Sequence, residues 1–211
     1  MKKFELTNEF ITNMFGTKLF RIRALVEFGD VEAGELGGYV EKESNLGHDD
    51  NAWVYDNAWV YGNAWVYGDA QVSGDARVYD NAWVYGDAQV SGDARVYGNA
   101  RVYGNAWVYG NAWVYGNAWV YGNALVCSDE DYAYAHGFGS VNRTTTFFRL
   151  KDGGVGVRCG CFYGTLAQFR DKIRETHGET KKAQEYLMLA DLMELRFEED
   201  ENEVGNRKYV E

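Results

Sequence analysis

Proline is absent from the 211-residue sequence, and cysteine occurs only three times. Without proline, a rigid proline-rich linker is excluded, and the 25 glycines indicate many regular tight turns instead. A small and odd number of cysteines disfavours a secreted disulfide scaffold and fits a reducing compartment. No apolar segment follows the first two lysines, so we expect no signal peptide and a cytoplasmic location.

Basic residues are also few. The chain has 21 Lys and Arg residues against 32 Asp and Glu residues, which gives a formal net charge of −11. Proteins that coat nucleic acid or lie on anionic membranes use clustered Lys and Arg, so both kinds of partner are disfavoured. No apolar run approaches the roughly 20 residues that span a bilayer. Since 46% of the residues are hydrophobic, we expect a folded core rather than a disordered chain.

What the sequence does contain is a six-residue repeat, which runs from Asn51 to Ser128. Its pattern is [Asn/Asp]-Ala-x-Val-x-[Gly/Asp], and the 78 residues hold 13 such hexads. Alternation along a strand turns Ala and Val to one side and the variable residues to the other. The block GDAQVSGDARVY recurs after 18 residues, or three hexads, at 68–79 and 86–97. The repeat therefore predicts a triangular β-helix of about four coils, with one hexad on each side.

The 18-residue period also assigns the outward residues to three faces. All seven tryptophans occupy outward positions, and tyrosines recur one coil apart on the second and third faces. Such aromatic rows have three explanations: stacking between neighbouring coils, burial against another subunit, or a platform for a ligand. The subunit interpretation makes five tryptophans interface candidates: Trp59, Trp65, Trp83, Trp113 and Trp119.

The segments on either side lack the repeat. Residues 1–50 contain strand-like sequence and clustered glycines, and we expect them to cap the first coil, because an open coil end is an exposed sheet edge. Residues 129–211 predict a small α+β domain. Within it, 144–150 and 155–162 are typical of two strands, and the Lys-Asp-Gly-Gly sequence between them is typical of a hairpin turn.

Two helices should follow this hairpin, so the C-terminal domain is expected to be ββαα. Thr165 and Gln168 form a capping box for the first helix, and Gly178 is a stop signal. The second helix should span about 180–197, with an acidic tail at 198–203. The apolar positions are Leu166, Phe169 and Ile173 in the first helix, and Ala183, Leu187, Ala190 and Leu195 in the second.

Arginines stand among the aromatic rows of the repeat and again beside the C-terminal hairpin. A guanidinium group binds anions, stacks on a base, or simply covers an aromatic face. We therefore take these arginines, with the tyrosines beside the first group, as candidate ligand-binding residues. They are Arg77, Arg95, Arg101, Tyr79, Tyr97, Tyr103, Arg143, Arg149 and Arg158.

Residues suited to catalysis or metal binding are scarce. The three histidines, His48, His136 and His177, all lie outside the repeat. Cys159 and Cys161 should share one strand face, where they are either ordinary buried cysteines or, with His136 or His177, zinc ligands. A single CxC is a weak signal, which favours ordinary burial. We therefore predict no catalytic residue, metal or cofactor.

The repeat resembles the left-handed parallel β-helix of hexapeptide-repeat proteins, with Ala and Val at its inward positions. The resemblance implies left-handed coils, which periodicity alone does not establish. Enzymes of this fold are chiefly acyltransferases, with some zinc carbonic anhydrases, and both place histidines between neighbouring β-helices. This repeat has neither a histidine nor an inserted loop, which argues against such an activity here.

A wider resemblance rests on three features together: the leader GDVEAGELGGYVEKESNL, the near-identical hexads and the ending FFRLKDGGVGVRCGCFYGTLAQF. With them the chain resembles the small hexapeptide-repeat proteins of bacteriophages and prophages. This resemblance implies expression in the cytoplasm of a bacterial host. It also implies interference with a host defence, either by binding a host protein or by sequestering a nucleotide signal.

These observations lead to one main hypothesis, a mainly β, non-catalytic binding protein that forms a homo-oligomer, either a dimer or a trimer. Its β-helix would serve as scaffold and interaction surface. The alternatives are an anti-defence protein that sequesters a host nucleotide immune signal, and a hexapeptide-repeat acyltransferase. An acidic mimic of DNA is disfavoured, because the repeat sets three Arg against only six Asp.

Overall fold

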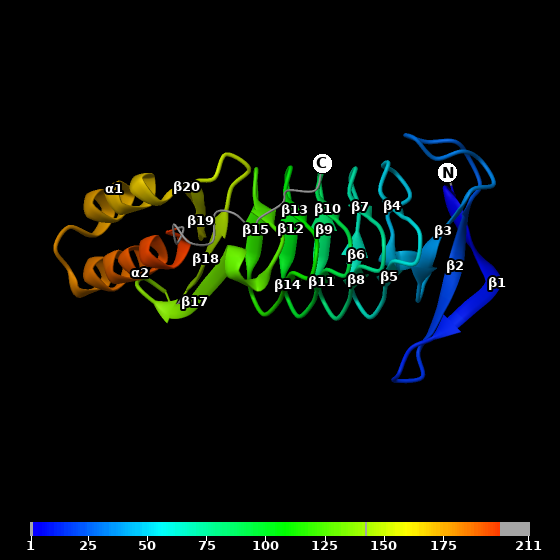
Figure 1. The fold of residues 1–211 in the computed structure, drawn as a ribbon, viewed down its shortest axis with the longest axis horizontal. Coiled ribbons are helices and arrows are strands. Elements are labelled where there is room, and N and C mark those ends of the chain that lie inside the picture. Colours follow the sequence, from blue (N-terminus) through cyan, green and yellow to red (C-terminus); the bar gives the residue numbers. More distant parts are fainter. Residues whose placement is uncertain (1, 142, 199–211) are drawn as a thin grey trace.

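The structure is a computed structural model that describes residues 2–141 and 143–198. It is mainly β, as the sequence predicts, and it is elongated (Figure 1). An antiparallel sheet lies at the N-terminal end, a parallel β-solenoid forms the middle, and an antiparallel sheet with two helices lies at the other end. Two 3-10 turns, η1 (Glu43–Asn45) and η2 (Asp129–Asp131), precede and follow the repeat.

The repeat forms a parallel β-solenoid of about five turns. Strands three hexads apart pair with each other, which confirms the three faces: a first face β4-β7-β10-β13-β16, a second face β5-β8-β11-β14 and a third face β6-β9-β12-β15. The strands are β4 (Trp53–Val54), β5 (Trp59–Val60), β6 (Trp65–Val66), β7 (Gln71–Val72), β8 (Arg77–Val78), β9 (Trp83–Tyr85), β10 (Gln89–Val90), β11 (Arg95–Val96), β12 (Arg101–Tyr103), β13 (Trp107–Val108), β14 (Trp113–Val114), β15 (Trp119–Tyr121) and β16 (Leu125–Val126).

The expected count of about four coils is too low, because residues before the repeat join the winding. Strand β3 (Leu36–Val40) pairs in parallel with β5, and Leu46 forms a parallel bridge to Val66. These residues lack the hexad pattern, so the repeat alone does not reveal that they continue the solenoid. The handedness of the coils stays a prediction of the resemblance.

The solenoid interior is filled by the Ala and Val of every hexad, which are at most 1% exposed. Backbone N–H groups donate to the next coil, as from Trp59 to the carbonyl of Ala76 at 2.9 Å. Gly68 shows why the corners use glycine: its φ is +72°, and a Cβ there would lie 2.9 Å from the backbone nitrogen of Gly86. The narrow interior therefore selects small and β-branched side chains, and the tight corner selects glycine.

The segment before the repeat covers the first coil. Strands β1 (Phe4–Thr12) and β2 (Lys18–Ala24) pair antiparallel, and β3 extends them into the second face. Trp53 occupies an outward position of the repeat, yet it is fully buried, because the rings of Phe4 and Phe28 pack against it with centroids 6.2 and 5.3 Å away. The sheet edge of the first coil is thereby shielded from solvent.

The C-terminal sheet has four strands rather than the two that the sequence predicts. They are β17 (Tyr132–Phe138), β18 (Arg143–Arg149), β19 (Val155–Cys159) and β20 (Phe162–Thr165), paired antiparallel in that order. The single strand expected at 155–162 was wrong, because Gly160 adopts a φ of +59° and turns the chain. Cys159 and Cys161 therefore lie on either side of a turn and do not share a strand face.

Two helices pack on this sheet, α1 (Leu166–His177) and α2 (Lys181–Phe197). The capping box of Thr165 and Gln168 is confirmed, since each side chain bonds to the backbone N–H of the other residue. In α2 not every apolar position faces the core, since the side chain of Leu195 is 67% exposed. The buried residues are Leu166, Phe169 and Ile173 in α1, and Ala183, Tyr186, Ala190, Met193 and Phe197 in α2.

The acidic tail expected at 198–203 lies outside the described residues, apart from Glu198. Among the described residues, no helix combines the length and the apolar character that a bilayer crossing requires.

The stacked interior makes a prediction about Ala94, which is fully buried. The substitution Ala94→Leu adds three carbon atoms where neighbouring coils leave no room, and we expect it to destabilise the protein by about 3 kcal/mol. Gln89→Leu is the matched control, because Leu125 already occupies the equivalent outward position two coils later. Its effect should stay within about 0.5 kcal/mol. Thermal unfolding followed by circular dichroism measures the stability of both variants. Equal losses of stability for Ala94→Leu and Gln89→Leu would contradict a tightly packed interior.

Candidate functional site

Two columns of tyrosine rings run along the solenoid, one on the second face and one on the third. Tyr79 and Tyr97 stack with ring centroids 4.9 Å apart, and Tyr85 and Tyr103 stack at 4.7 Å. The distance between coils is about 4.8 Å, so each ring lies on the ring of the preceding coil. Stacking between neighbouring coils thus accounts for the tyrosines. The columns are Tyr61, Tyr79, Tyr97 and Tyr115, and Tyr67, Tyr85, Tyr103 and Tyr121.

The tyrosine columns shift the acid–base behaviour of their hydroxyl groups. Burial raises the pKa of Tyr79 and of Tyr85 from the ordinary 10.0 to about 12. Burial also raises the pKa of Tyr61, Tyr67 and Tyr97. The neighbouring rings add to the shift for Tyr79 and Tyr85, because tyrosinates one coil apart would repel each other.

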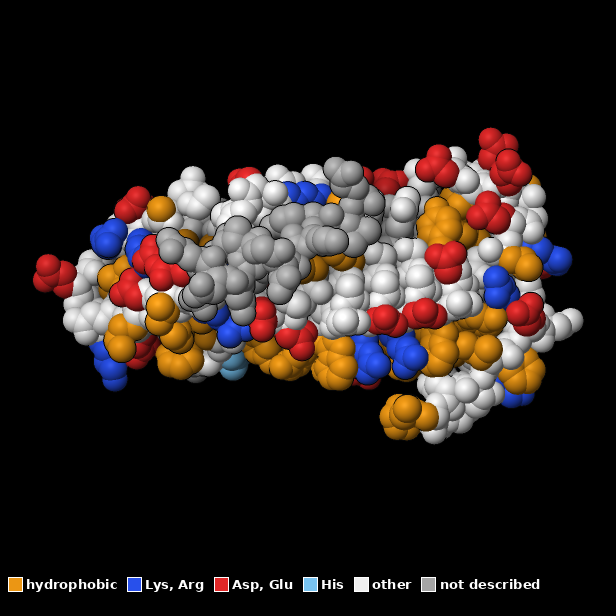
Figure 2. All heavy atoms as spheres, in the orientation of Figure 1, with side chains coloured by type: hydrophobic (Ala, Val, Ile, Leu, Met, Phe, Trp, Pro, Cys, Tyr) orange, Lys and Arg blue, Asp and Glu red, His pale blue; other side chains and the backbone are white. Residues whose placement is uncertain are grey.

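On the second face the arginines lie on tryptophans. The guanidinium carbon of Arg77 is 4.3 Å from the ring centroid of Trp59, and that of Arg95 is 4.7 Å from Trp113. Figure 2 shows basic side chains with hydrophobic ones on both sides along the edge of the solenoid. These contacts hold the guanidinium groups against the aromatic surface and leave part of each group in solvent.

On the third face the same contacts form an alternating column. Arg101 lies between Trp83 and Trp119, with its guanidinium carbon 4.6 and 4.9 Å from the two ring centroids. Arg158, from β19 of the C-terminal sheet, continues the column at 5.1 Å from Trp119. Of the five tryptophans expected at an interface, Trp65 and Trp113 are the most exposed, at 38% and 40%.

The second face also carries two columns of like charge. Arg77 and Arg95 are direct partners on β8 and β11, and Asp75 and Asp93 lie two residues before them. Among the described residues, none of these four side chains forms an ion pair. Like charges that face each other across neighbouring strands are destabilising, and no ion pair within the described part of the chain offsets this repulsion.

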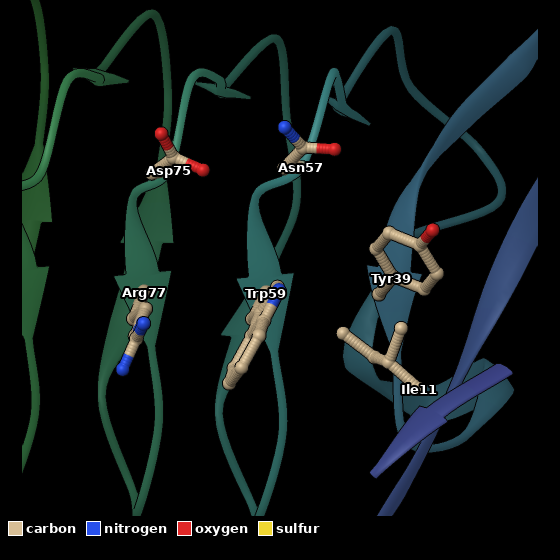
Figure 3. Close-up of a pocket in the computed structure, with 6 residues that line it drawn as sticks. All are labelled: Ile11, Tyr39, Asn57, Trp59, Asp75 and Arg77. Atoms are coloured by element: carbon tan, nitrogen blue, oxygen red, sulfur yellow. The ribbon is translucent and has the colours of Figure 1, made fainter. Parts of the chain in front are cut away.

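A shallow pocket of about 210 Å³ lies over these columns. Figure 3 shows its side chains in two rows along neighbouring coils, with the corner residues in one row and the mid-strand residues in the other. Ile11 of β1 and Tyr39 of β3 form the remaining wall. The lining residues are Ile11, Tyr39, Asn57, Trp59, Asp75 and Arg77.

A larger cleft of about 460 Å³ lies between the last coil and the C-terminal sheet. Arg158 Nε donates to the hydroxyl of Tyr103 at 3.1 Å, and its Nη1 donates to the carbonyl of Phe162 at 3.0 Å, so its position is fixed. His136 Nδ1 lies 3.0 Å from the hydroxyl of Thr144. The cleft is lined by Asn117, Trp119, His136, Val141, Arg143, Thr144, Arg158 and Gly160, and none of these is acidic.

The structure brings together only some of the predicted ligand-binding residues. Arg143 and Arg158 line one cleft, but Arg149 does not join them. Its side chain is buried, and its Nε lies 3.3 Å from a carboxylate oxygen of Asp131. Its strand turns this side chain toward the protein interior and away from the cleft, and a ligand-binding role for Arg149 stays a prediction. Tyr79 and Tyr97 lie in the column of the second face, and Tyr103 contacts the cleft only through Arg158.

Sequence reasoning missed several cleft residues. Asn117, Trp119 and Thr144 come from different elements, so no sequence motif joins them. One signal was available: Asn recurs every 18 residues at the corner before the third face, which predicts an amide ladder. Asn63, Asn81, Asn99 and Asn117 form this ladder, each Nδ2 donating to the next Oδ1 at 3.2–3.4 Å.

The histidines and cysteines are dispersed. His48 stacks on Phe4 in the cap with centroids 4.4 Å apart, and His177 lies at the end of α1 against Tyr186. Cys159 is half-buried, and Cys161 is exposed. Within residues 2–141 and 143–198, no group of three His, Cys, Asp or Glu side chains is placed to hold a metal ion.

These features define the chain as a parallel β-solenoid repeat protein with two faces of stacked aromatic and basic side chains and a basic cleft at one end. The solenoid is similar to the family described as the YdcK β-solenoid repeat, whose model matches residues 52–68, 70–86, 88–104, 94–110, 100–116 and 106–122. The matches lie inside the repeat, so the likeness does not extend to the flanking segments. No curated protein matches the chain.

The stacked tyrosines predict a shifted alkaline titration. Because the folded state keeps their protons above the ordinary pKa of 10.0, it binds more protons than the unfolded state between about pH 10 and 12. The contribution of these tyrosines to stability should therefore be constant below this window and fall as the pH rises through it. Tyrosinate absorbance measured with and without urea tests this. A native titration curve that coincides with the unfolded one would contradict the stacking.

Proposed function

We propose that the protein is a non-catalytic binding scaffold that acts as a homodimer, joined through the second face of its solenoid. The observation that carries this proposal is the pair of like-charged columns, Arg77 with Arg95 and Asp75 with Asp93. Each column repels itself within one chain, and a partner with the opposite columns at the same spacing would offset that cost.

A second copy of this chain is such a partner. The acidic and basic columns run side by side along the solenoid, because each Asp lies at the corner two residues before the Arg of the following strand. A twofold axis parallel to the solenoid, between the columns, lays Asp75 against Arg77 and Asp93 against Arg95 of the other copy. An isologous interface needs a self-complementary patch of this kind. A twofold axis parallel to the strands would instead bring the Arg column of one copy onto the Arg column of the other, so the two solenoids lie parallel rather than antiparallel.

The β1–β2 hairpin supports the same assembly. It helps to wall the pocket on the second face through Ile11, and its tip carries Met14 and Phe15, which are 86% and 81% exposed. Trp113 and Tyr115, further along this face, are also exposed. Large apolar side chains at a protruding turn are typical of a surface that a partner covers.

The geometry gives no support to the acyltransferase alternative. The three histidines lie in the cap, on β17 and at the end of α1, so none of them stands on the solenoid faces where two copies would meet. An origin in a bacteriophage or prophage, a cytoplasmic location in a bacterial host, and a role against a host defence stay predictions of the sequence resemblance.

Reversal of charge in both columns tests the dimer. Arg77→Glu with Arg95→Glu makes both columns acidic, and Asp75→Arg with Asp93→Arg makes both basic. Each double variant should be monomeric by light scattering, while an equal mixture of the two should recover the dimer mass. High salt should weaken the wild-type dimer, because dissolved ions screen the attraction between the oppositely charged columns.

Circular dichroism and thermal unfolding serve as controls that each variant is folded. A wild-type protein that is monomeric at micromolar concentration would overturn the proposal. So would double variants that remain dimeric alone, since the interface would then not use these columns.

A further inference from the structure

We infer that the cleft between the last coil and the C-terminal sheet binds the phosphate group of a small molecule. The inference rests on the proposed function only in that the protein binds rather than transforms its ligand. The cleft lies at the end of the third face, whereas the proposed dimer uses the second face. The two ideas can therefore fail separately.

The positive charge of the cleft is the first support. Arg143 and Arg158 both line it, and its eight lining residues include no carboxylate, in a chain whose net charge is −11. Among the described residues, neither arginine takes part in an ion pair. A volume of about 460 Å³ falls within the range of small-molecule sites. Guanidinium groups give planar forks of donors that match phosphate oxygens.

One arginine of the cleft is held in place before any ligand arrives, and the backbone leaves room for the other. Arg158 is fixed by its bonds to Tyr103 and to the carbonyl of Phe162. Arg143 lies against Gly160, where a Cβ would collide with its guanidinium group. Gly160 thus leaves the space that this side chain occupies. A side chain that is fixed as Arg158 is loses little entropy on binding.

The amide ladder of the third face is the second, independent support. All its hydrogen bonds point the same way, because every Nδ2 donates to the Asn of the following coil, toward the C-terminal end. At the acceptor end, Lys42 Nζ donates to Asn63 Oδ1 at 3.3 Å. At the donor end, Asn117 lines the cleft, and within the described residues its Nδ2 has no acceptor. Chains of hydrogen bonds polarise one another, so a cation at one end favours an anion at the other.

The cleft selects a phosphate group rather than an aromatic ring. Trp119 is its aromatic side chain, but guanidinium groups from Arg101 and Arg158 already lie over this ring. A base has no free face on which to stack. Donors surround the cleft instead: the two arginines, the Asn117 amide and the Thr144 hydroxyl, with His136 beside them. A group with several acceptor oxygens satisfies more of these donors than a carboxylate does.

Isothermal titration calorimetry with inorganic pyrophosphate at low ionic strength tests the inference, with succinate as a carboxylate probe. We expect pyrophosphate to bind and to bind more tightly than succinate. Arg143→Gln with Arg158→Gln should weaken binding by at least about tenfold, since two charge-assisted contacts are lost. Lys172→Gln with Arg174→Gln, which removes two exposed charges from α1, should leave the affinity within about twofold.

A second pair of variants keeps the test independent of Arg158, whose bonds also join the sheet to the solenoid. Asn117→Asp places a carboxylate at the donor end of the ladder and should weaken pyrophosphate binding by about tenfold. Asn105→Asp is its control, because Asp69 and Asp87 occupy the equivalent corner in other coils. The inference is overturned if the wild type binds no pyrophosphate, if succinate binds as tightly, or if Asn117→Asp and Asn105→Asp act alike. Light scattering of the same variants should show the wild-type mass, which separates this site from the dimer.

Discussion

The fixed spacing between coils is the constraint on which the rest of this structure depends. Backbone hydrogen bonds, such as that from Trp59 to Ala76, hold residues 18 positions apart directly above one another, about 4.8 Å apart. Every side chain therefore meets its equivalent in the next coil. Tyrosine rings and asparagine amides gain from this arrangement, because rings stack and each amide both donates and accepts. Like charges such as those of Arg77 and Arg95 do not gain from it, because they repel each other at this distance.

The same constraint indicates where the protein has unmet interactions. In a column of identical rings each ring stacks on its neighbours, so the tyrosine columns need no partner. A column of like charges remains unsatisfied along its length and favours a partner that lies alongside it. A ladder of amides lacks hydrogen-bond partners of its own only at its two ends. Lys42 donates to the acceptor end at Asn63, and the donor end at Asn117 lies in the basic cleft. The proposed dimer surface and the proposed anion site correspond to these two cases.

The sequence predicts what is periodic and fails where the chain is not. The three faces, the inward Ala and Val, and the helix caps of Thr165 follow from local spacing and are all seen. The burial of Trp53 could not be predicted, because it depends on Phe4 and Phe28 from the non-repeating cap. The pairing of Arg149 with Asp131 and the convergence of Arg143, Arg158 and Asn117 likewise depend on how the C-terminal sheet docks on the last coil. Strand propensity also did not predict the turn at Gly160, which divides the expected strand at 155–162 into two.

Small-angle X-ray scattering of the wild-type protein tests the central claim most directly, namely that stacked charge columns join two parallel solenoids along their second faces. A side-by-side pair has twice the mass of one chain and a thicker cross-section, but a maximum dimension close to that of a single elongated chain. This is the result we predict. A particle of single-chain mass, or a dimer of about twice the single-chain length joined end to end, would contradict it.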